Sequence, residues 1–139
     1  MFENIVDLPH EPTEEDGLVV YMIVNTDLRM SSGKIGGQCG HAIQYLMQMY
    51  MNNNRMFFSG NAEIFYNRMT AWLNSGKHSK VTLAADTKEF EKIKAEYNPI
   101  VVRDAGLTEI AAGSETVICL YPMFKSERTK LIKRLQALK

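Results

Sequence analysis

Three polar side chains early in the sequence could act together on one substrate. Lys34, Gln38 and His41 follow one another at steps of four and three residues, so a helix would place them on one stripe. An ammonium, an amide and an imidazole can stabilise negative charge, hold a polar group and transfer a proton. Each also has an ordinary structural explanation, because isolated helical Lys and Gln are usually solvated and isolated His usually packs.

The segment that precedes this stripe is suited to an anion. Ser31-Ser32-Gly33-Lys34 joins an expected strand to an expected helix start, where free backbone N–H groups and the helix dipole favour negative charge. It is not a Walker phosphate loop, because Leu28 and Ile35 stand where that motif needs Gly and Ser or Thr. Gly36 and Gly37 weaken the first helical turn, which suggests that another group approaches the backbone closely.

A second candidate set lies in a long connection after an expected strand. Asp104 and Thr108 belong to residues 104–115, and connections of that length in compact domains are commonly functional. The glycines and alanines of this connection indicate ordered turns. Asp104 could orient a water molecule and Thr108 could hold a substrate. The alternative is that Asp104 only closes a turn.

Apolar patterning predicts the elements that position both sets. Residues 17–25 form a β-branched and aromatic run, typical of a strand buried on both faces. Other periodic and apolar stretches predict helices at 34–51, 61–74, 87–97 (capped by Thr87) and 124–138, and strands at 80–85, 100–103 and 116–121. The order β-α-α-β-α-β-β-α favours an α/β fold, a three-layer sandwich in which a four-stranded mixed sheet has helices on both faces.

Charge divides the chain into two parts. Residues 1–17 hold six acidic and no basic residues, and we expect an acidic N-terminal extension that is held weakly or not at all. Residues 18–139 are expected to form one domain. With 16 basic and 10 acidic residues, a balance of +6, this domain is compatible with an RNA partner without requiring one.

Several cations are candidates for RNA phosphate contacts, although a solvated surface is their ordinary explanation. The expected last helix places cations beside its leucines: Lys125, Arg128, Lys130, Lys133 and Arg134. Arg103, next to Asp104, is a further candidate.

No feature of the sequence indicates a membrane, secretion or a metal. No apolar run approaches the ~18 residues that a membrane helix needs, and the N-terminal residues lack a signal-peptide pattern. Cys39 and Cys119 have no metal-ligand spacing and fit reduced thiols. We expect a cytoplasmic protein. A Cys39 nucleophile is conceivable, but Cys39 lies on the apolar side of its helix and is better explained by packing.

Two segments resemble a known family. Residues 21–28, followed by 33–42 (GKIGGQCGHA), look like the first strand and helix of the type 2 peptidyl-tRNA hydrolases, and 101–117 (VVRDAGLTEIAAGSETV) resemble that family's second signature. The resemblance covers roughly residues 18–139. It implies hydrolysis of the ester between a peptide and the terminal ribose of tRNA, no metal or organic cofactor, and a homodimer. The active-site set that it implies is Lys34, Gln38, His41, Asp104 and Thr108.

The chain departs from the family pattern at three places. Leu107 stands where Arg is usual and Glu109 where Gln is usual, and both changes could weaken phosphate contacts. The stretch 51–79 is longer than usual and could form a rim or a dimer contact. Two alternatives stay open: a weak or inactive family member that acts as a binding or adaptor module, and an esterase or amidase for small acylated substrates.

The preferred hypothesis gives each candidate a part in ester hydrolysis. Asp104 would orient or deprotonate the attacking water, and Lys34 would stabilise the developing oxyanion. His41 would assist proton transfer or hold Asp104 and the water in register. Gln38 and Thr108 would fix the ester and the peptide.

Overall fold

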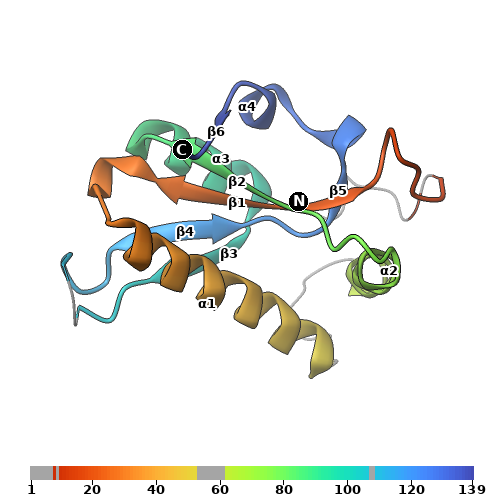
Figure 1. Cartoon of the computed structure of the whole chain (residues 1–139), viewed down its shortest axis with the longest axis horizontal. Coiled ribbons are helices and arrows are strands. Elements are labelled where there is room, and N and C mark those ends of the chain that lie inside the picture. Colours follow the sequence, from red (N-terminus) through yellow and green to blue (C-terminus); the bar gives the residue numbers. More distant parts are fainter. Residues whose placement is uncertain (1–7, 9, 53–61, 107–108) are drawn as a thin grey trace.

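The computed structural model describes residues 8, 10–52, 62–106 and 109–139. Its elements follow in the order β1 (Leu18–Asn25), a 3-10 turn η2 (Thr26–Leu28), α1 (Ser32–Met51), α2 (Ala62–Asn74), β2 (Lys80–Ala85), α3 (Thr87–Tyr97), β3 (Ile100–Arg103), β4 (Glu115–Cys119), β5 (Met123–Phe124), a 3-10 turn η4 (Lys125–Glu127), α4 (Lys130–Lys133) and β6 (Gln136–Ala137). Figure 1 shows this arrangement. In the described residues, no helix is long and apolar enough to cross a membrane.

The strands form one mixed sheet, which confirms the predicted α/β class. Their order is β3-β4-β1-β2-β6, and β5 pairs with the first residues of β1. The β1–β2 pair is parallel and the other pairs are antiparallel. The prediction of four strands was wrong, since the described residues contain six. The two extra strands, β5 and β6, have two residues each, too short for an alternating pattern to reveal them.

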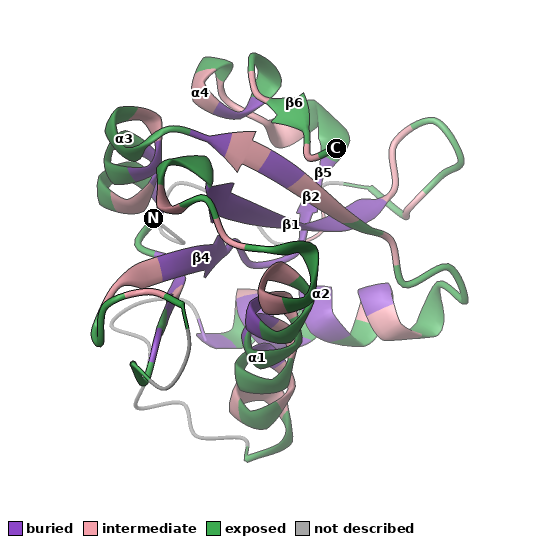
Figure 2. Cartoon of the chain, turned by 60° about the vertical axis from the view of Figure 1, so that its left-hand side comes forward, coloured by how far each residue is buried: buried purple, intermediate pink, exposed green. Residues whose placement is uncertain are grey.

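β1 separates two apolar clusters, as expected for a strand buried on both faces. All eight of its residues are buried, and successive side chains point to opposite sides of the sheet. Val20 and its alternate neighbours pack with α1 and α2, whereas Ile23 and its alternate neighbours pack with α3 and with Ile132 of α4. Figure 2 shows the buried residues along β1 and β4 and the exposed outer side of α1.

The predicted C-terminal helix at 124–138 is wrong. Only Lys130–Lys133 is α-helical, because tertiary contacts hold the residues on either side. The Thr129 hydroxyl lies 2.7 Å from the Tyr97 hydroxyl, and β6 pairs with β2 while Leu138 N donates to Thr82 O at 3.0 Å. Pairing with the open edge of β2 satisfies backbone groups that a continued helix would leave exposed on that strand.

The start of α3 also differs from the prediction. Its N-cap is Asp86, not Thr87. The Asp86 side chain accepts from Glu89 N at 2.8 Å, and the Glu89 carboxylate accepts from Asp86 N at 3.1 Å. This reciprocal pair is a capping box, which satisfies two backbone donors at the helix start.

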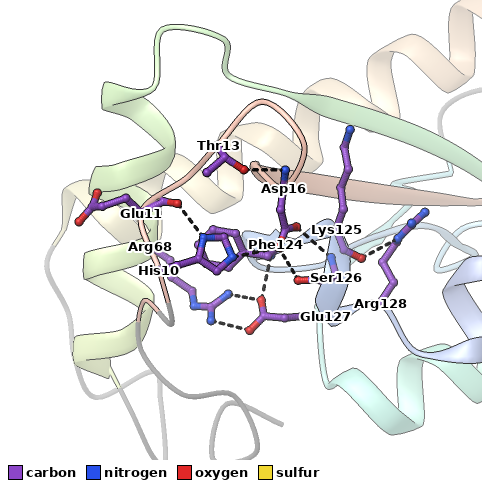
Figure 3. A network of polar contacts seen from close by, with 10 residues as sticks. All are labelled: His10, Glu11, Thr13, Asp16, Arg68, Phe124, Lys125, Ser126, Glu127 and Arg128. Carbon is purple, nitrogen blue, oxygen red and sulfur yellow. Dashed lines mark hydrogen bonds and ion pairs between the residues drawn. The ribbon is translucent and has the colours of Figure 1, made fainter.

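Residues 10–16 are held against the domain, in contrast to the weak attachment that their composition predicted. The Asp16 carboxylate accepts from Ser126 N at 3.0 Å and from Ser126 Oγ at 2.5 Å. His10 Nε2 lies 2.9 Å from Asp16, and the His10 ring packs on Phe124 with centroids 4.3 Å apart. Figure 3 shows this network around η4. Acidic composition alone therefore did not reveal that one of these acids has a specific partner.

Candidate active site

One residue from each of the two candidate sets takes part in an ion pair, and the two residues are 70 positions apart. Lys34 Nζ contacts Asp104 Oδ1. Lys34 lies in the first turn of α1, and Asp104 directly follows β3. Their side chains are 11% and 2% exposed. The pair thus lies at the edge of the core, with the carboxylate withdrawn from water and the ammonium partly accessible.

Backbone contacts hold Asp104 in place. Its N–H donates to Ser114 O at 2.9 Å, and its carbonyl accepts from Gly113 N at 2.8 Å. Gly106 N donates to Asp104 Oδ2 at 2.7 Å. Gly106 has φ +81°, and a Cβ added there would lie 2.4 Å from Ala112 Cβ, so only glycine fits. The described part of the connection is therefore ordered by tight turns, as predicted.

The surroundings of Asp104 favour its charged form. The hydrogen bond from Lys34 is the largest influence and lowers the pKa of the carboxyl below its ordinary value. Burial opposes this shift, and the Gly106 N–H and the charge of Lys34 add to it. Asp104 is therefore ionised at neutral pH. A carboxylate of lowered pKa is a weak base but a good acceptor for orienting water.

The structure buries Gln38 instead of exposing it on a polar stripe. Gln38 is 5% exposed and shares the inner side of α1 with Ala42 and Leu46. Its Oε1 accepts from Thr116 Oγ1 at 2.6 Å, and this hydroxyl also lies 3.2 Å from Val102 O. Thr116 was not singled out from the sequence, because nothing distinguishes it from another strand residue.

His41 makes no hydrogen bond with Asp104 in the part of the chain that the structure describes. His41 is exposed, and its ring stacks with that of Tyr45 at 6.2 Å between centroids. The hydrogen bonds of the Asp104 side chain go to Lys34 and Gly106, so His41 does not hold Asp104 among the described residues. Thr108 lies outside the described residues, and so does Leu107.

The solvent side of α1 is unusually open beside the ion pair. No described atom beyond the helix itself lies within 4 Å of the positions where a Cβ would stand at Gly33, Gly36, Gly37 and Gly40. The close approach that the sequence suggested is therefore not made by the described part of this chain. The space beside these glycines allows another molecule to contact the helix backbone next to Lys34.

Two hollows among the described residues lie away from the Lys34–Asp104 pair. One of about 600 Å³ lies between residues 11–14 and the end of α2, and another of about 270 Å³ lies between the end of β2 and residues 134–136. Neither includes Lys34 or Asp104. Among the described residues, the candidate site is a largely buried ion pair beside the exposed side of α1.

Burial gives the two cysteines no nucleophilic character. It raises the pKa of the Cys39 thiol, and it raises that of the fully buried Cys119 to about 12. This agrees with packing as their role. The described residues also contain no group of three or more His, Cys, Asp or Glu side chains able to hold a metal ion.

The predicted phosphate-binding cations do not surround this site. Arg103 donates to Glu115 at 3.1 Å, and Glu115 is also paired with Lys94 at 2.5 Å. The other candidates lie in or beside η4 and α4: Lys125, Arg128, Lys130, Lys133 and Arg134. η4 follows the strand that pairs with the start of β1, and α4 packs on the sheet face opposite α1. The cations of α4 are therefore on the other face of the sheet from Lys34, and those of η4 are near the opposite end of β1.

Comparisons of the sequence with known proteins identify a family and several relatives. The profile of the family described as "Peptidyl-tRNA hydrolase PTH2" matches residues 18–138. The chain is 34% identical to "Peptidyl-tRNA hydrolase 2" of Saccharomyces cerevisiae, over 76% of this chain and 50% of that protein. It is 28% identical to "Probable peptidyl-tRNA hydrolase 2" of Drosophila melanogaster, over 88% of this chain and 63% of that protein.

A shorter relative is matched over more of its length. The chain is 31% identical to "Peptidyl-tRNA hydrolase" of Thermococcus sibiricus, over 73% of this chain and 80% of that protein. The chain thus spans between half and two thirds of the yeast and fly proteins and most of the archaeal one. The matched region begins at β1 and includes both halves of the Lys34–Asp104 pair. This chain belongs to the peptidyl-tRNA hydrolase PTH2 family.

Proposed function

We propose that the protein hydrolyses the ester bond of peptidyl-tRNA and releases the peptide and free tRNA. The observation that carries this proposal is the Lys34–Asp104 pair at the open, glycine-rich start of α1. It brings together a cation and an ionised carboxylate from the two segments that resemble the family's signatures. Membership of the PTH2 family supports the same reaction.

Lys34 and Asp104 have complementary roles in this proposal. An ammonium has three N–H donors, and among the described residues the one acceptor of Lys34 Nζ is Asp104. Two donors are therefore left for the ester carbonyl oxygen, where negative charge develops as water attacks. The Asp104 carboxylate accepts a hydrogen bond from that water and orients it, because its lowered pKa suits an acceptor better than a base.

The remaining candidates have supporting roles. The attacking water loses a proton, and the leaving ribose oxygen gains one. We assign this transfer to His41, because it lies on the same helix as Lys34 and its exposed ring is accessible to the substrate. Gln38 fixes α1 against β4 through Thr116, which leaves only its amide nitrogen for a contact with the ester. Thr108 remains a prediction for the peptide contact.

The proposal is tested by release of the N-acylated amino acid from an N-acyl-aminoacyl-tRNA. Wild type is compared with Lys34→Ala and Asp104→Asn, and Lys88→Ala serves as a control because Lys88 is exposed on α3. We expect turnover in the wild type and the control, and its loss in both site variants while they stay folded. A folded wild type without turnover would reject the hydrolase and favour a binding module.

We also propose that the protein forms a homodimer, as the family resemblance implies. The exposed large apolar side chains of the described residues, Tyr45 and Met51, both lie on α1 at 38% and 74% exposure. Both side chains are therefore available for a contact with a second copy along α1. Light scattering at micromolar concentration measures the mass, and a mass of one chain would reject the dimer.

Two further expectations concern location and domain boundaries. We propose a cytoplasmic protein, because its substrate is a product of translation, and microscopy of a tagged chain tests this. We propose that residues 1–17 are an extension of a domain at 18–139. The start of the family match and of β1 at residue 18 supports this boundary, and the catalytic activity of a chain that begins at residue 18 tests it.

Contacts of the cations with tRNA phosphate form the last part of the proposal. Lys125, Lys130 and Lys133 are exposed, so they are available to a polyanion, whereas Arg103 is partly neutralised by Glu115. Neutralising one of these lysines lowers the salt dependence of tRNA binding if it contacts a phosphate. An unchanged slope in all three variants would remove this region from the tRNA contact.

A further inference from the structure

Glu109 makes a two-point contact with the start of α1. Its Oε2 accepts from Ser31 N at 2.9 Å, and its Oε1 accepts from Ser31 Oγ at 2.8 Å. The two residues are 78 positions apart. The position for which the sequence predicted an anion is therefore occupied by a carboxylate of this chain.

Ser31 is the N-cap of the helix that carries Lys34. Its Oγ accepts from Lys34 N at 3.3 Å. A hydroxyl has one proton and two lone pairs. Donation of the proton to Glu109 therefore turns a lone pair of the same oxygen toward Lys34 N. Glu109 thus fixes the orientation of the cap, and the cap fixes the first turn of α1.

Glu109 and Asp104 belong to the same connection, between β3 and β4. This connection is joined to the first turn of α1 at two places, by Asp104 at Lys34 Nζ and by Glu109 at Ser31. The bonds from the Ser31 N–H and hydroxyl lower the pKa of Glu109, burial opposes them, and the charge of Lys34 adds to the lowering. Glu109 is thus ionised at neutral pH and suited to both bonds.

We propose that Glu109 is a positioning residue for hydrolysis, which holds the first turn of α1 so that Lys34 Nζ stays against Asp104. This inference rests on the proposed function. Glu109 touches neither the ester nor the water, and its two hydrogen bonds, not its charge, are what the site requires. Glutamine can accept from the Ser31 N–H with its oxygen and donate to Ser31 Oγ with its amide nitrogen, so it keeps a two-point contact without the charge. Alanine can form neither bond, so the two substitutions separate these requirements.

The experiment compares Glu109→Ala and Glu109→Gln with a matched control. Glu89→Ala is the control, because Glu89 accepts from the N-cap of α3 as Glu109 does from that of α1. Turnover of N-acyl-aminoacyl-tRNA gives kcat and KM, and an NMR titration gives the pKa of Asp104 without any substrate. Thermal unfolding of each variant shows whether stability alone explains a loss of activity.

We expect kcat of Glu109→Ala to fall about tenfold, since small displacements of catalytic groups have effects of this size or larger. KM should change less than twofold. Glu109→Gln should keep at least half of the wild-type kcat, and Glu89→Ala should match the wild type. The pKa of Asp104 should rise in Glu109→Ala only, although loss of a nearby negative charge by itself would lower it.

Two results would overturn the inference. One is equal kcat in Glu109→Ala and Glu89→Ala, and the other is an unchanged pKa of Asp104 in Glu109→Ala. If the wild type itself shows no turnover, the proposed function fails, and the titration of Asp104 still decides whether Glu109 positions the pair. If Glu109→Ala does not fold, Ser31→Ala removes the same hydroxyl contact and takes its place in both measurements.

Discussion

Two of the ion pairs between distant segments, Lys34–Asp104 and Arg68–Glu127, have different surroundings. Lys34–Asp104 spans 70 residues and Arg68–Glu127 spans 59. The cation of each pair is withdrawn from solvent, with 11% and 1% of the side chain exposed. Arg68 donates to both oxygens of Glu127, at 2.6 and 2.8 Å, and lies 5.3 Å from the centre of the Phe124 ring (Figure 3).

The difference shows that burial of an ion pair does not by itself identify a reactive site. The planar guanidinium of Arg68 matches the Glu127 carboxylate, which also accepts from Phe124 N at 2.8 Å. That pair connects α2 to η4 and serves the fold. Lys34 instead presents an ammonium with one partner among the described residues, beside the exposed side of α1. The N–H donors of Lys34 that are not used by Asp104 lie next to the exposed backbone of α1. This availability distinguishes the candidate site from the Arg68–Glu127 pair.

The largest expected effect is on stability, from Glu127→Ala. It removes the carboxylate that accepts from two nitrogens of the buried Arg68 guanidinium, and we expect the free energy of unfolding to fall by about 3 kcal/mol. Chemical denaturation measures it. Glu14→Ala is the control, because the Glu14–Lys77 pair is long, 3.5 Å, and exposed. A loss below ~1 kcal/mol in Glu127→Ala would show that the Arg68 pair does not stabilise the fold.

The second expected effect is on catalysis, from Lys34→Ala. Loss of the oxyanion donor should lower kcat by about 100-fold or more, with a smaller loss of stability than in Glu127→Ala. Steady-state hydrolysis of N-acyl-aminoacyl-tRNA measures it. Glu127→Ala, assayed below its unfolding temperature, should keep wild-type kcat. If both variants lost turnover equally, the contrast between a reactive and a structural pair would be wrong.

The third prediction concerns the pH dependence of the site. Because folding lowers the pKa of Asp104 below its ordinary 3.8, its charged form stabilises the protein above that value. This stabilisation is lost as pH falls through the lower pKa of the folded state. The difference in unfolding free energy between wild type and Asp104→Asn should be constant above about pH 5 and should shrink below about pH 4. A difference that shrinks between pH 6 and 8 would contradict the assignment.

The smallest expected effect tests the attachment of residues 10–16. Asp16→Ala removes two hydrogen bonds to Ser126 at the surface, and we expect a loss of about 1 kcal/mol in unfolding free energy. Turnover should not change, since Asp16 contacts η4 and not α1. Differential scanning calorimetry and the hydrolysis assay measure both quantities. A marked fall in kcat would mean that this network and the site are coupled.

Local sequence determined most elements and pointed to the two residues of the candidate pair. A β-branched run predicted that β1 is a strand buried on both faces. Periodic apolar residues predicted α1, α2 and α3 to within a few residues. Residue type and position at a helix start and after a strand made Lys34 and Asp104 candidates, and the resemblance of their two segments to the family's signatures selected them. These features depend on neighbours within one or two turns, so they can be recognised in the sequence alone.

Tertiary structure decided what depended on distant partners. The open edge of β2 turned the expected last helix into α4 and β6, and Thr116 drew Gln38 into the core. Ser126 held Asp16, and Ser31 held Glu109. These contacts join residues that are 50 or more positions apart, and no local pattern specifies them. When the hydrogen-bond partner of a polar residue lies that far away in the sequence, only the folded structure shows which partner it has.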